Sequence, residues 1–169
     1  MLTNQEAMRL IGLPKKVMEK GNPVDVISWR WENGKARYFL SVEQEPNYSF
    51  LLDIQQSLKN NLKITLHFQE DTSKTGLLRI DYHGQHQNPR EIKSSLPDRF
   101  KPYAAKWFDY HEHHIHYYVE GYKPLAWAIP LADDEFPIKD ITTTTDIFPV
   151  IQEFAVRINL ETKFERVSS

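Results

Sequence analysis

Histidines gather in one short stretch of the sequence. Residues 110–118 read YHEHHIHYY and hold four of the seven histidines of the chain. An imidazole titrates near neutral pH and is a common metal ligand, so this stretch is the densest cluster of groups suited to acid–base chemistry or to metal binding. The other histidines, His67, His83 and His86, lie on or just after other predicted strands. A site shared between these segments is therefore geometrically feasible.

The histidine stretch has the pattern of a strand with two different faces. Side chains two residues apart on a strand point to the same side, so His114, His116 and Tyr118 share one face and Ile115 and Val119 share the other. We expect the more apolar face in the core and the histidine face toward a polar surface or cleft. Two imidazoles about 6.5–7 Å apart along a strand can chelate one metal ion or act as acid and base, and both uses require a third group.

The third group is expected from residues 81–89, provided that the strand before them lies near the histidine strand. Asp81 is placed to orient an imidazole, His86 to complete a three-histidine metal set, and Glu112 and Glu120 are alternative carboxylates. The candidate catalytic residues are therefore His114, His116, Tyr118, His86 and Asp81. The candidate ligands for a divalent cation such as Zn²⁺ are His114, His116 and His86.

A plainer interpretation of the same stretch stays open. A strand rich in His and Tyr also suits a half-exposed sheet surface, where rings pair across strands without doing chemistry. We favour this interpretation for His111, His113 and His67.

Hydrophobic patterning predicts an α+β fold: one domain over residues 1–169, with an antiparallel sheet flanked by N-terminal, middle and C-terminal helices. Thr3 or Asn4 can cap the first helix, and an apolar stripe from Ile147 to Ile158 predicts the last. A middle helix is expected from Leu96 to near Tyr110. Strands are expected at residues 24–31, 36–43, 50–54, 62–68, 78–82, 115–119 and 125–131, with Asn33-Gly34 joining the first two as a hairpin.

Composition sets the remaining limits. The chain has no cysteine, so any metal must be held by nitrogen and oxygen ligands, and its formal net charge of −2 provides no overall field for gathering polyanions. No apolar run approaches the roughly 20 residues that a membrane helix needs, so we expect no membrane partner. The N-terminal residues lack the pattern of a signal peptide, which makes the cytoplasm the expected location.

The chain also resembles a group of small bacterial domain families of unknown function, which pair an Asn-Pro loop with a strand reading Pro-His-x-His. The resemblance spans most of the chain and rests on His86-x-Asn88-Pro89, His114-x-His116-x-Tyr118, Gly121-Tyr122, Trp127-Ala128-Ile129 and the opening segment with Pro14-Lys15-Lys16. Such families are similar in context to toxin–antitoxin and mobile-element proteins, which implies an RNA-directed or phage-conflict role. This chain departs from the pattern at His113, where Pro is usual, and in the predicted helix before His114.

Two functions follow from these observations. The first is a phosphodiester- or nucleotide-directed hydrolase of the toxin type, with His114 and His116 as base and acid, or with a His-bound metal, and with Arg79 or Arg90 stabilising charge on phosphate. Its partner would be RNA or a nucleotide. The second is a binding module without enzymatic activity, such as an antitoxin, an immunity protein or a phage-encoded inhibitor, whose His and Tyr face binds a protein partner.

Overall fold

The computed structural model describes residues 1–30 and 34–166. In chain order its elements are α1 (Asn4–Gly12), β1 (Lys16–Glu19), β2 (Asn22–Val24), β3 (Val26–Trp29), β4 (Lys35–Ser41), β5 (Phe50–Gln56), β6 (Ile64–Glu70), β7 (Thr75–Tyr82), β8 (His86–Gln87), the 3-10 helix Asp98–Tyr103, β9 (Trp107–Phe108), β10 (His114–Tyr117), β11 (Trp127–Pro130), the 3-10 helices Leu131–Asp133 and Thr144–Asp146, α2 (Ile147–Arg157) and β12 (Lys163–Arg166).

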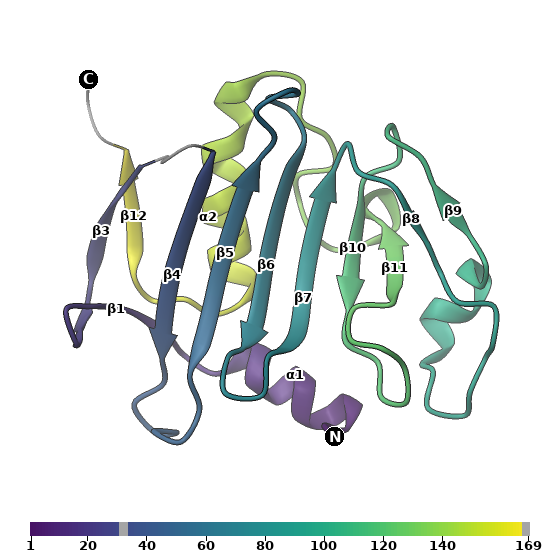
Figure 1. Cartoon of the computed structure of the whole chain (residues 1–169), viewed down its shortest axis with the longest axis horizontal. Coiled ribbons are helices and arrows are strands. Elements are labelled where there is room, and N and C mark those ends of the chain that lie inside the picture. The colour runs from purple at the N-terminus through teal and green to yellow at the C-terminus, as the bar shows by residue number, and fades with distance from the viewer. Residues whose placement is uncertain (31–33, 167–169) are drawn as a thin grey trace.

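A large antiparallel sheet forms the centre of this single-domain α+β fold. Its strands run in the order β11-β10-β7-β6-β5-β4-β1-β2. Both α-helices lie on one face, with α2 running behind β5 and β6 and α1 at the lower end of β6 and β7 (Figure 1). The apolar stripe of α2 is buried against that face, as its spacing predicts. None of the described helices is long and apolar enough to cross a membrane.

The N-terminal helix forms as its sequence predicts. The hydroxyl of Thr3 accepts a hydrogen bond from the backbone N–H of Glu6, and the Glu6 carboxylate accepts one from the N–H of Thr3. This capping box satisfies two N–H groups that the first turn leaves without helical partners. Ala7, Leu10 and Ile11 are buried on the side that faces the sheet.

Two predicted elements differ in the structure. The helix expected from Leu96 to near Tyr110 is replaced by the short 3-10 helix Asp98–Tyr103 and by β9. Pro97 and Pro102 explain the difference, because a proline supplies no N–H for a continuing α-helix. The hairpin expected around Asn33-Gly34 is also not formed between the described strands: β3 pairs in parallel with β12, while β4 pairs with β1 and β5. Asn33 itself lies outside the described residues.

The face of the sheet opposite the helices is polar. Strand pairing aligns side chains of this face in two rows that cross the sheet from β4 to β10. The first row consists of Arg37, Asp53, His67, Arg79 and His116, and the second of Lys35, Gln55, Thr65, Asp81 and His114. The two rows bring groups from five strands to one surface.

Candidate functional site

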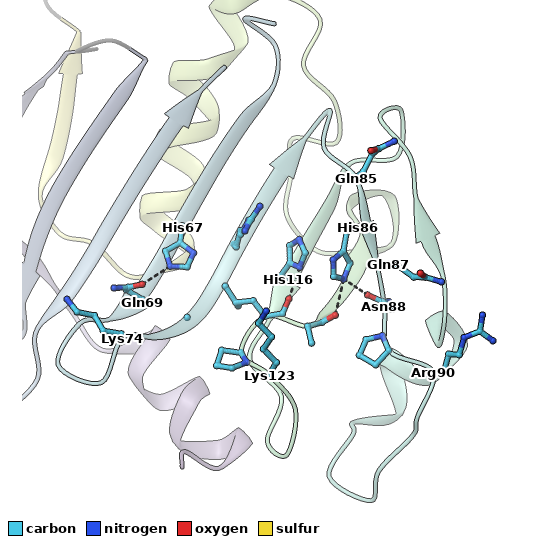
Figure 2. A pocket seen from close by; sticks show the side chains of 16 residues that line it. His67, Gln69, Lys74, Gln85, His86, Gln87, Asn88, Arg90, His116 and Lys123 are labelled. Atoms are coloured by element: carbon cyan, nitrogen blue, oxygen red, sulfur yellow. Dashed lines mark hydrogen bonds between the residues drawn. The ribbon is translucent and has the colours of Figure 1, made fainter. Parts of the chain in front are cut away.

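A cavity of about 890 Å³ opens on the polar face between β6, β7 and the segment that carries β8 (Figure 2). Its wall includes His67, His86 and His116, together with four cationic side chains, Lys74, Arg79, Arg90 and Lys123. No Asp or Glu lines it among the described residues. The cavity is therefore basic, although the whole chain carries a small negative charge.

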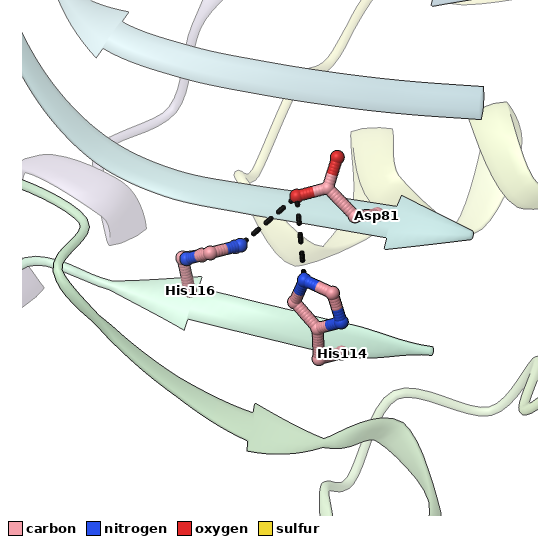
Figure 3. Close-up of side chains that lie close together, drawn as sticks. All are labelled: Asp81, His114 and His116. Atoms are coloured by element: carbon pink, nitrogen blue, oxygen red, sulfur yellow. Dashed lines mark hydrogen bonds and ion pairs between the residues drawn. The ribbon is translucent and has the colours of Figure 1, made fainter. Parts of the chain in front are cut away.

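Asp81 and the His-x-His strand meet beside this cavity. β7 and β10 are neighbours, and their register places Asp81 opposite His114 and Arg79 opposite His116. Oδ2 of Asp81 lies 2.9 Å from Nε2 of His116 and 3.7 Å from Nε2 of His114 (Figure 3). A shared site requires the Asp81 strand to lie beside the His114–His116 strand, and the sequence alone does not specify that these two strands pair.

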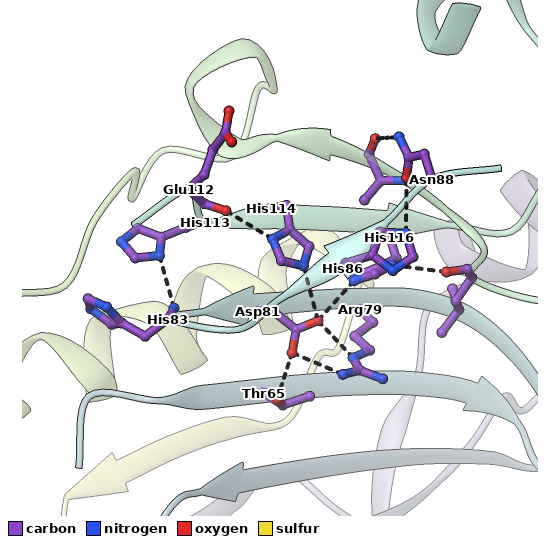
Figure 4. A network of polar contacts seen from close by, with 12 residues as sticks. Thr65, Arg79, Asp81, His83, His86, Asn88, Glu112, His113, His114 and His116 are labelled. Atoms are coloured by element: carbon purple, nitrogen blue, oxygen red, sulfur yellow. Dashed lines mark hydrogen bonds and ion pairs between the residues drawn. The ribbon is translucent and has the colours of Figure 1, made fainter. Parts of the chain in front are cut away.

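The carboxylate of Asp81 is surrounded by donors. Oδ1 accepts from the Thr65 hydroxyl (2.7 Å) and from Nη2 of Arg79 (3.1 Å), and Oδ2 accepts from Nε of Arg79 (2.9 Å) and from His116 (Figure 4). Four bonds fill the lone-pair positions of a carboxylate. Burial by itself raises the pKa of Asp81, but the His116 hydrogen bond and the Arg79 charge outweigh it and hold this pKa below its ordinary value. Asp81 is ionised at neutral pH.

Both ring nitrogens of His116 face hydrogen-bond acceptors. Its Nδ1 lies 2.9 Å from the carbonyl oxygen of Leu125, and its Nε2 faces the Asp81 carboxylate. Both oxygens can only accept hydrogen bonds, so the imidazolium ring, which donates from both nitrogens, satisfies both contacts. His116 is only 4% exposed. In this geometry both ring nitrogens of His116 are engaged by the protein itself, at the wall of the cavity.

His114 is neutral and lies deeper. Its Nδ1 lies 3.0 Å from the carbonyl oxygen of Glu112 and therefore carries the ring proton. Burial, followed by the nearby charge of His116, lowers the pKa of His114 to about 4. Its Nε2 is buried and has no hydrogen-bond partner in the described part of the chain. The expected exposure of His114 to a polar surface is not observed, because Phe108 and His86 cover the ring.

His86 closes the site from the adjacent segment. Its ring centroid lies 4.5 Å from that of His116, and its Nε2 lies 2.9 Å from the carbonyl oxygen of Ala126. The buried side chain of Asn88 fixes this segment. Its oxygen accepts from the N–H of Ala128 and its nitrogen donates to the carbonyl of the same residue, so Asn88 caps the outer edge of β11.

Tyr118 is not brought to the site. β10 ends at Tyr117, and the Tyr118 hydroxyl donates to the carbonyl oxygen of Leu2, next to the N-terminal helix. The alternative carboxylates are also engaged elsewhere. Glu112 pairs with Lys106, and Glu120 accepts from the N–H of Asn4.

His67, which the sequence interpretation assigns to a half-exposed sheet surface, lines the cavity. It lies in the first row between Asp53 and Arg79. Burial is the main reason that its pKa is lowered, so the ring is neutral at pH 7. The signal was present in the sequence: the short connection between β6 and β7 makes His67 and Arg79 cross-strand neighbours on the face opposite the core.

The ligand atoms that converge belong to Asp81, His114 and His116, all within 4.8 Å of one another, and this set differs from the expected three-histidine set. Backbone carbonyls hold Nδ1 of both histidines, which is how histidine metal ligands are usually oriented. However, a cation at Oδ2 would have to replace Arg79 or the His116 proton, because all four positions on the carboxylate are taken. The residues fit a metal only after that exchange.

A second group of metal-ligand atoms joins His83, His113 and Asp140. Nδ1 of His113 accepts from the backbone N–H of His83, so the ring proton resides on Nε2, which lies 2.7 Å from the Asp140 carboxylate. This tautomer has no lone pair left for a metal. The contacts are those of a hydrogen-bonded His–Asp pair.

Comparison with known proteins gives a family but no activity. Neither a curated protein nor a solved structure matches the chain significantly. The sequence model of a family of unknown function, DUF6978, matches residues 2–160. The chain therefore belongs to the DUF6978 family.

Proposed function

We propose that the protein binds a phosphate ester, either a nucleotide or the backbone of RNA, in the basic cavity. The observation that carries this proposal is the composition of the cavity wall: four Lys or Arg side chains, three histidines and no carboxylate among the described lining residues. Phosphate is the anion best matched to several Lys and Arg side chains at one site.

The cations differ in how free they are to bind. Arg79 donates two hydrogen bonds to Asp81, from Nε and Nη2, and the other N–H groups of its guanidinium can donate to a ligand. Lys74 pairs with Asp71 at 2.8 Å, so its charge is largely compensated. Arg90 and Lys123 make no ion pair within the described residues and are the free cations of the wall. A phosphate at Arg79 would lie between His67 and His116, the neighbours of Arg79 in the first row.

Hydrolysis of the bound phosphodiester is the activity we propose for this site, with roles that differ from the simplest His-x-His scheme. His116 cannot release a proton without breaking a bond to Asp81 or Leu125, so it stabilises negative charge. His67 and His86 are the candidate bases. Burial lowers the pKa of both rings and so favours their neutral form, and Nδ1 of each makes no hydrogen bond within the described part of the chain and can accept a proton.

Calorimetric titration with inorganic phosphate and with adenosine monophosphate at low salt tests the binding proposal. Lys123→Glu should weaken both ligands at least tenfold, because it places a carboxylate in the wall. Lys163→Glu makes the same charge change on β12, which contributes no residue to this cavity, and should leave affinity unchanged. Equal affinity in both variants, or no binding by the unaltered protein, would overturn the proposal.

A separate assay tests cleavage. A fluorogenic RNA substrate should be cut by the unaltered protein and much more slowly by His67→Gln, with its affinity retained. Cleavage at the unaltered rate by His67→Gln and by His86→Gln would exclude both as bases. The toxin-type, RNA-directed role implied by the sequence resemblance forms part of this proposal, as does the cytoplasmic location expected from the N-terminal residues. Phosphate binding without RNA cleavage would favour the alternative of a binding module that captures a phosphorylated or acidic protein partner.

A further inference from the structure

The basic cavity continues into a second one on the same face of the sheet. This second cavity, of about 540 Å³, lies over β4, β5 and β6. The two cavities share His67, Gln69, Lys74 and Arg79 as lining residues. Three strand spacings separate β4 from β7, the strand that carries Arg79, or about 14 Å. A ligand held by its phosphate at Arg79 can therefore extend along the surface toward β4.

The second cavity has a different charge from the first. It is lined by three cations, Arg37, Lys74 and Arg79, and by two carboxylates, Asp53 and Asp71. Asp53 pairs with Arg37 at 3.5 Å and Asp71 with Lys74 at 2.8 Å. These pairs cancel most of the positive charge, so a second phosphate gains little there. A neutral, polar group fits this surface better.

An aromatic ring lies at the far end of the second cavity. Phe39 is 53% exposed on the polar face, directly opposite Leu51 on β5, and both residues line the cavity. An exposed ring near hydrogen-bonding side chains such as Asp53 and Gln69 offers what a nucleobase needs: a flat apolar surface and partners for its polar edge. Cationic grooves with exposed aromatic rings are a general means of binding single strands.

We propose that the second cavity takes a nucleobase of a single-stranded nucleic acid whose adjoining phosphate lies in the basic cavity, with Phe39 as the stacking residue. This inference rests on the proposed function and specifies its substrate class: a strand of two or more nucleotides. A duplex does not meet this requirement, because its bases are already stacked and paired.

Fluorescence anisotropy with a uridine RNA hexamer and the matching thymidine DNA hexamer, and calorimetry with inorganic phosphate, test the proposal. Phe39→Ala should weaken the RNA hexamer about tenfold or more and leave phosphate affinity unchanged. Tyr110→Ala provides the matched control, because Tyr110 is 50% exposed and lines neither cavity. Thermal melts should be unchanged for both variants, since both side chains are exposed.

The outcomes separate the two proposals. Phosphate binding together with hexamer binding that Phe39→Ala leaves intact would overturn the base subsite and keep the phosphate cavity. Failure of both phosphate and hexamer to bind would overturn the proposed function as well. A hexamer that binds no more tightly than phosphate would also overturn the base subsite. Comparison of the two hexamers identifies the sugar: an RNA preference of at least tenfold assigns an RNA strand, and equal affinity assigns single strands of either kind.

Discussion

The two faces of the sheet each bury a charged side chain, and they do so in different ways. Lys15 lies on the helix-covered face and is fully buried, while Asp81 lies on the polar face and is 4% exposed. Nζ of Lys15 donates to three backbone carbonyls, those of Ile11, Leu13 and Ile158. Asp81 instead accepts from three side chains, those of Thr65, Arg79 and His116.

The two charges differ in whether their hydrogen-bond partners also line a cavity. The carbonyls around Lys15 belong to the C-terminal ends of the two helices and the loop after α1, and the rings of Phe50 and Phe68 cover the ammonium group. The Lys15 side chain links the C-terminal ends of α1 and α2, and it lines none of the described cavities. Two partners of Asp81, Arg79 and His116, line the basic cavity. A buried charge thus indicates a functional site only when its partners reach a surface that a ligand can occupy.

The largest effect is expected from removing the charge on the polar face. Asp81→Leu leaves Arg79 and His116 as neighbouring cations without a counter-charge, and should lower the free energy of unfolding by about 3–5 kcal/mol. Urea denaturation followed by tryptophan fluorescence measures this loss. Unchanged stability would show that the network does not hold the fold together. Asp53→Leu is a suitable control, because within the described residues the Asp53 carboxylate accepts hydrogen bonds from Arg37 and Gln55 at the sheet surface.

Removing the Lys15 charge should lower stability and leave phosphate binding unchanged. Lys15→Met leaves three carbonyls without donors and should cost about 2–4 kcal/mol of stability. Phosphate affinity at a temperature where the variant stays folded should equal that of the unaltered protein, because Lys15 lines neither cavity of the polar face. A large loss of phosphate affinity in the folded variant would mean that the two faces are coupled.

The two faces should also respond to pH in different ranges. The pKa of His114 is lowered to about 4 by burial, whereas an unfolded histidine titrates near 6.5. The unfolded state therefore binds more protons between these values, and about 3 kcal/mol of stability should be lost as pH falls from about 6.5 to about 4. Burial lowers the pKa of Lys15 to about 7, whereas an unfolded lysine titrates near 10.4. The unfolded state therefore binds more protons between these values, and the free energy of unfolding should rise with pH above 7.

Urea denaturation across this pH range separates the two contributions. His114→Asn keeps a donor for the Glu112 carbonyl and should make the acid branch less steep, leaving the contributions of His67 and His86, whereas Lys15→Met should flatten the alkaline branch. His111→Asn, at an exposed position, should alter neither. The histidine assignment fails if His114→Asn retains the full acid dependence.

A smaller effect is expected where a glycine allows close packing over the polar face. A Cβ on Gly76 would lie 2.6 Å from Cδ1 of Leu125, whose carbonyl positions His116. Gly76→Ala should therefore cost about 1–3 kcal/mol and weaken phosphate binding by moving Leu125. Gly12→Ala meets nothing within 4 Å and should be nearly neutral. Equal phosphate affinity in both variants would show that the position of Leu125 does not matter to the site.

The smallest effect is expected from metal. Because Asp81 already accepts four hydrogen bonds, adding Zn²⁺ should shift the melting temperature by less than about 1 °C at neutral pH. Differential scanning fluorimetry measures the shift, with His114→Asn as the comparison. A rise of several degrees that His114→Asn abolishes would instead assign a metal site to Asp81, His114 and His116.

The sequence by itself determined the elements whose patterns are local. The capped N-terminal helix, the C-terminal helix and the hairpin of β10 and β11 follow from caps, periodicity and turn residues near each segment. The His-x-His spacing also fixed that His114 and His116 share a face, because strand alternation is a property of the backbone.

Only the tertiary structure decided which strands pair and which side chains therefore meet. Pairing of β7 with β10 placed Asp81 against both histidines, and pairing of β6 with β7 brought His67 and Arg79 into the same cavity. Pairing of β3 with β12, from opposite ends of the chain, replaced the predicted hairpin.

The physical reason is that strand pairing depends on hydrogen bonds and apolar contacts between distant segments, which one-dimensional periodicity does not specify. Burial, which also depends on the tertiary structure, changes the chemistry of the side chains. The imidazole of His114 is neutral because it is buried, whereas that of His116 contacts a carboxylate, and the neighbours of both rings are assembled only in the folded protein.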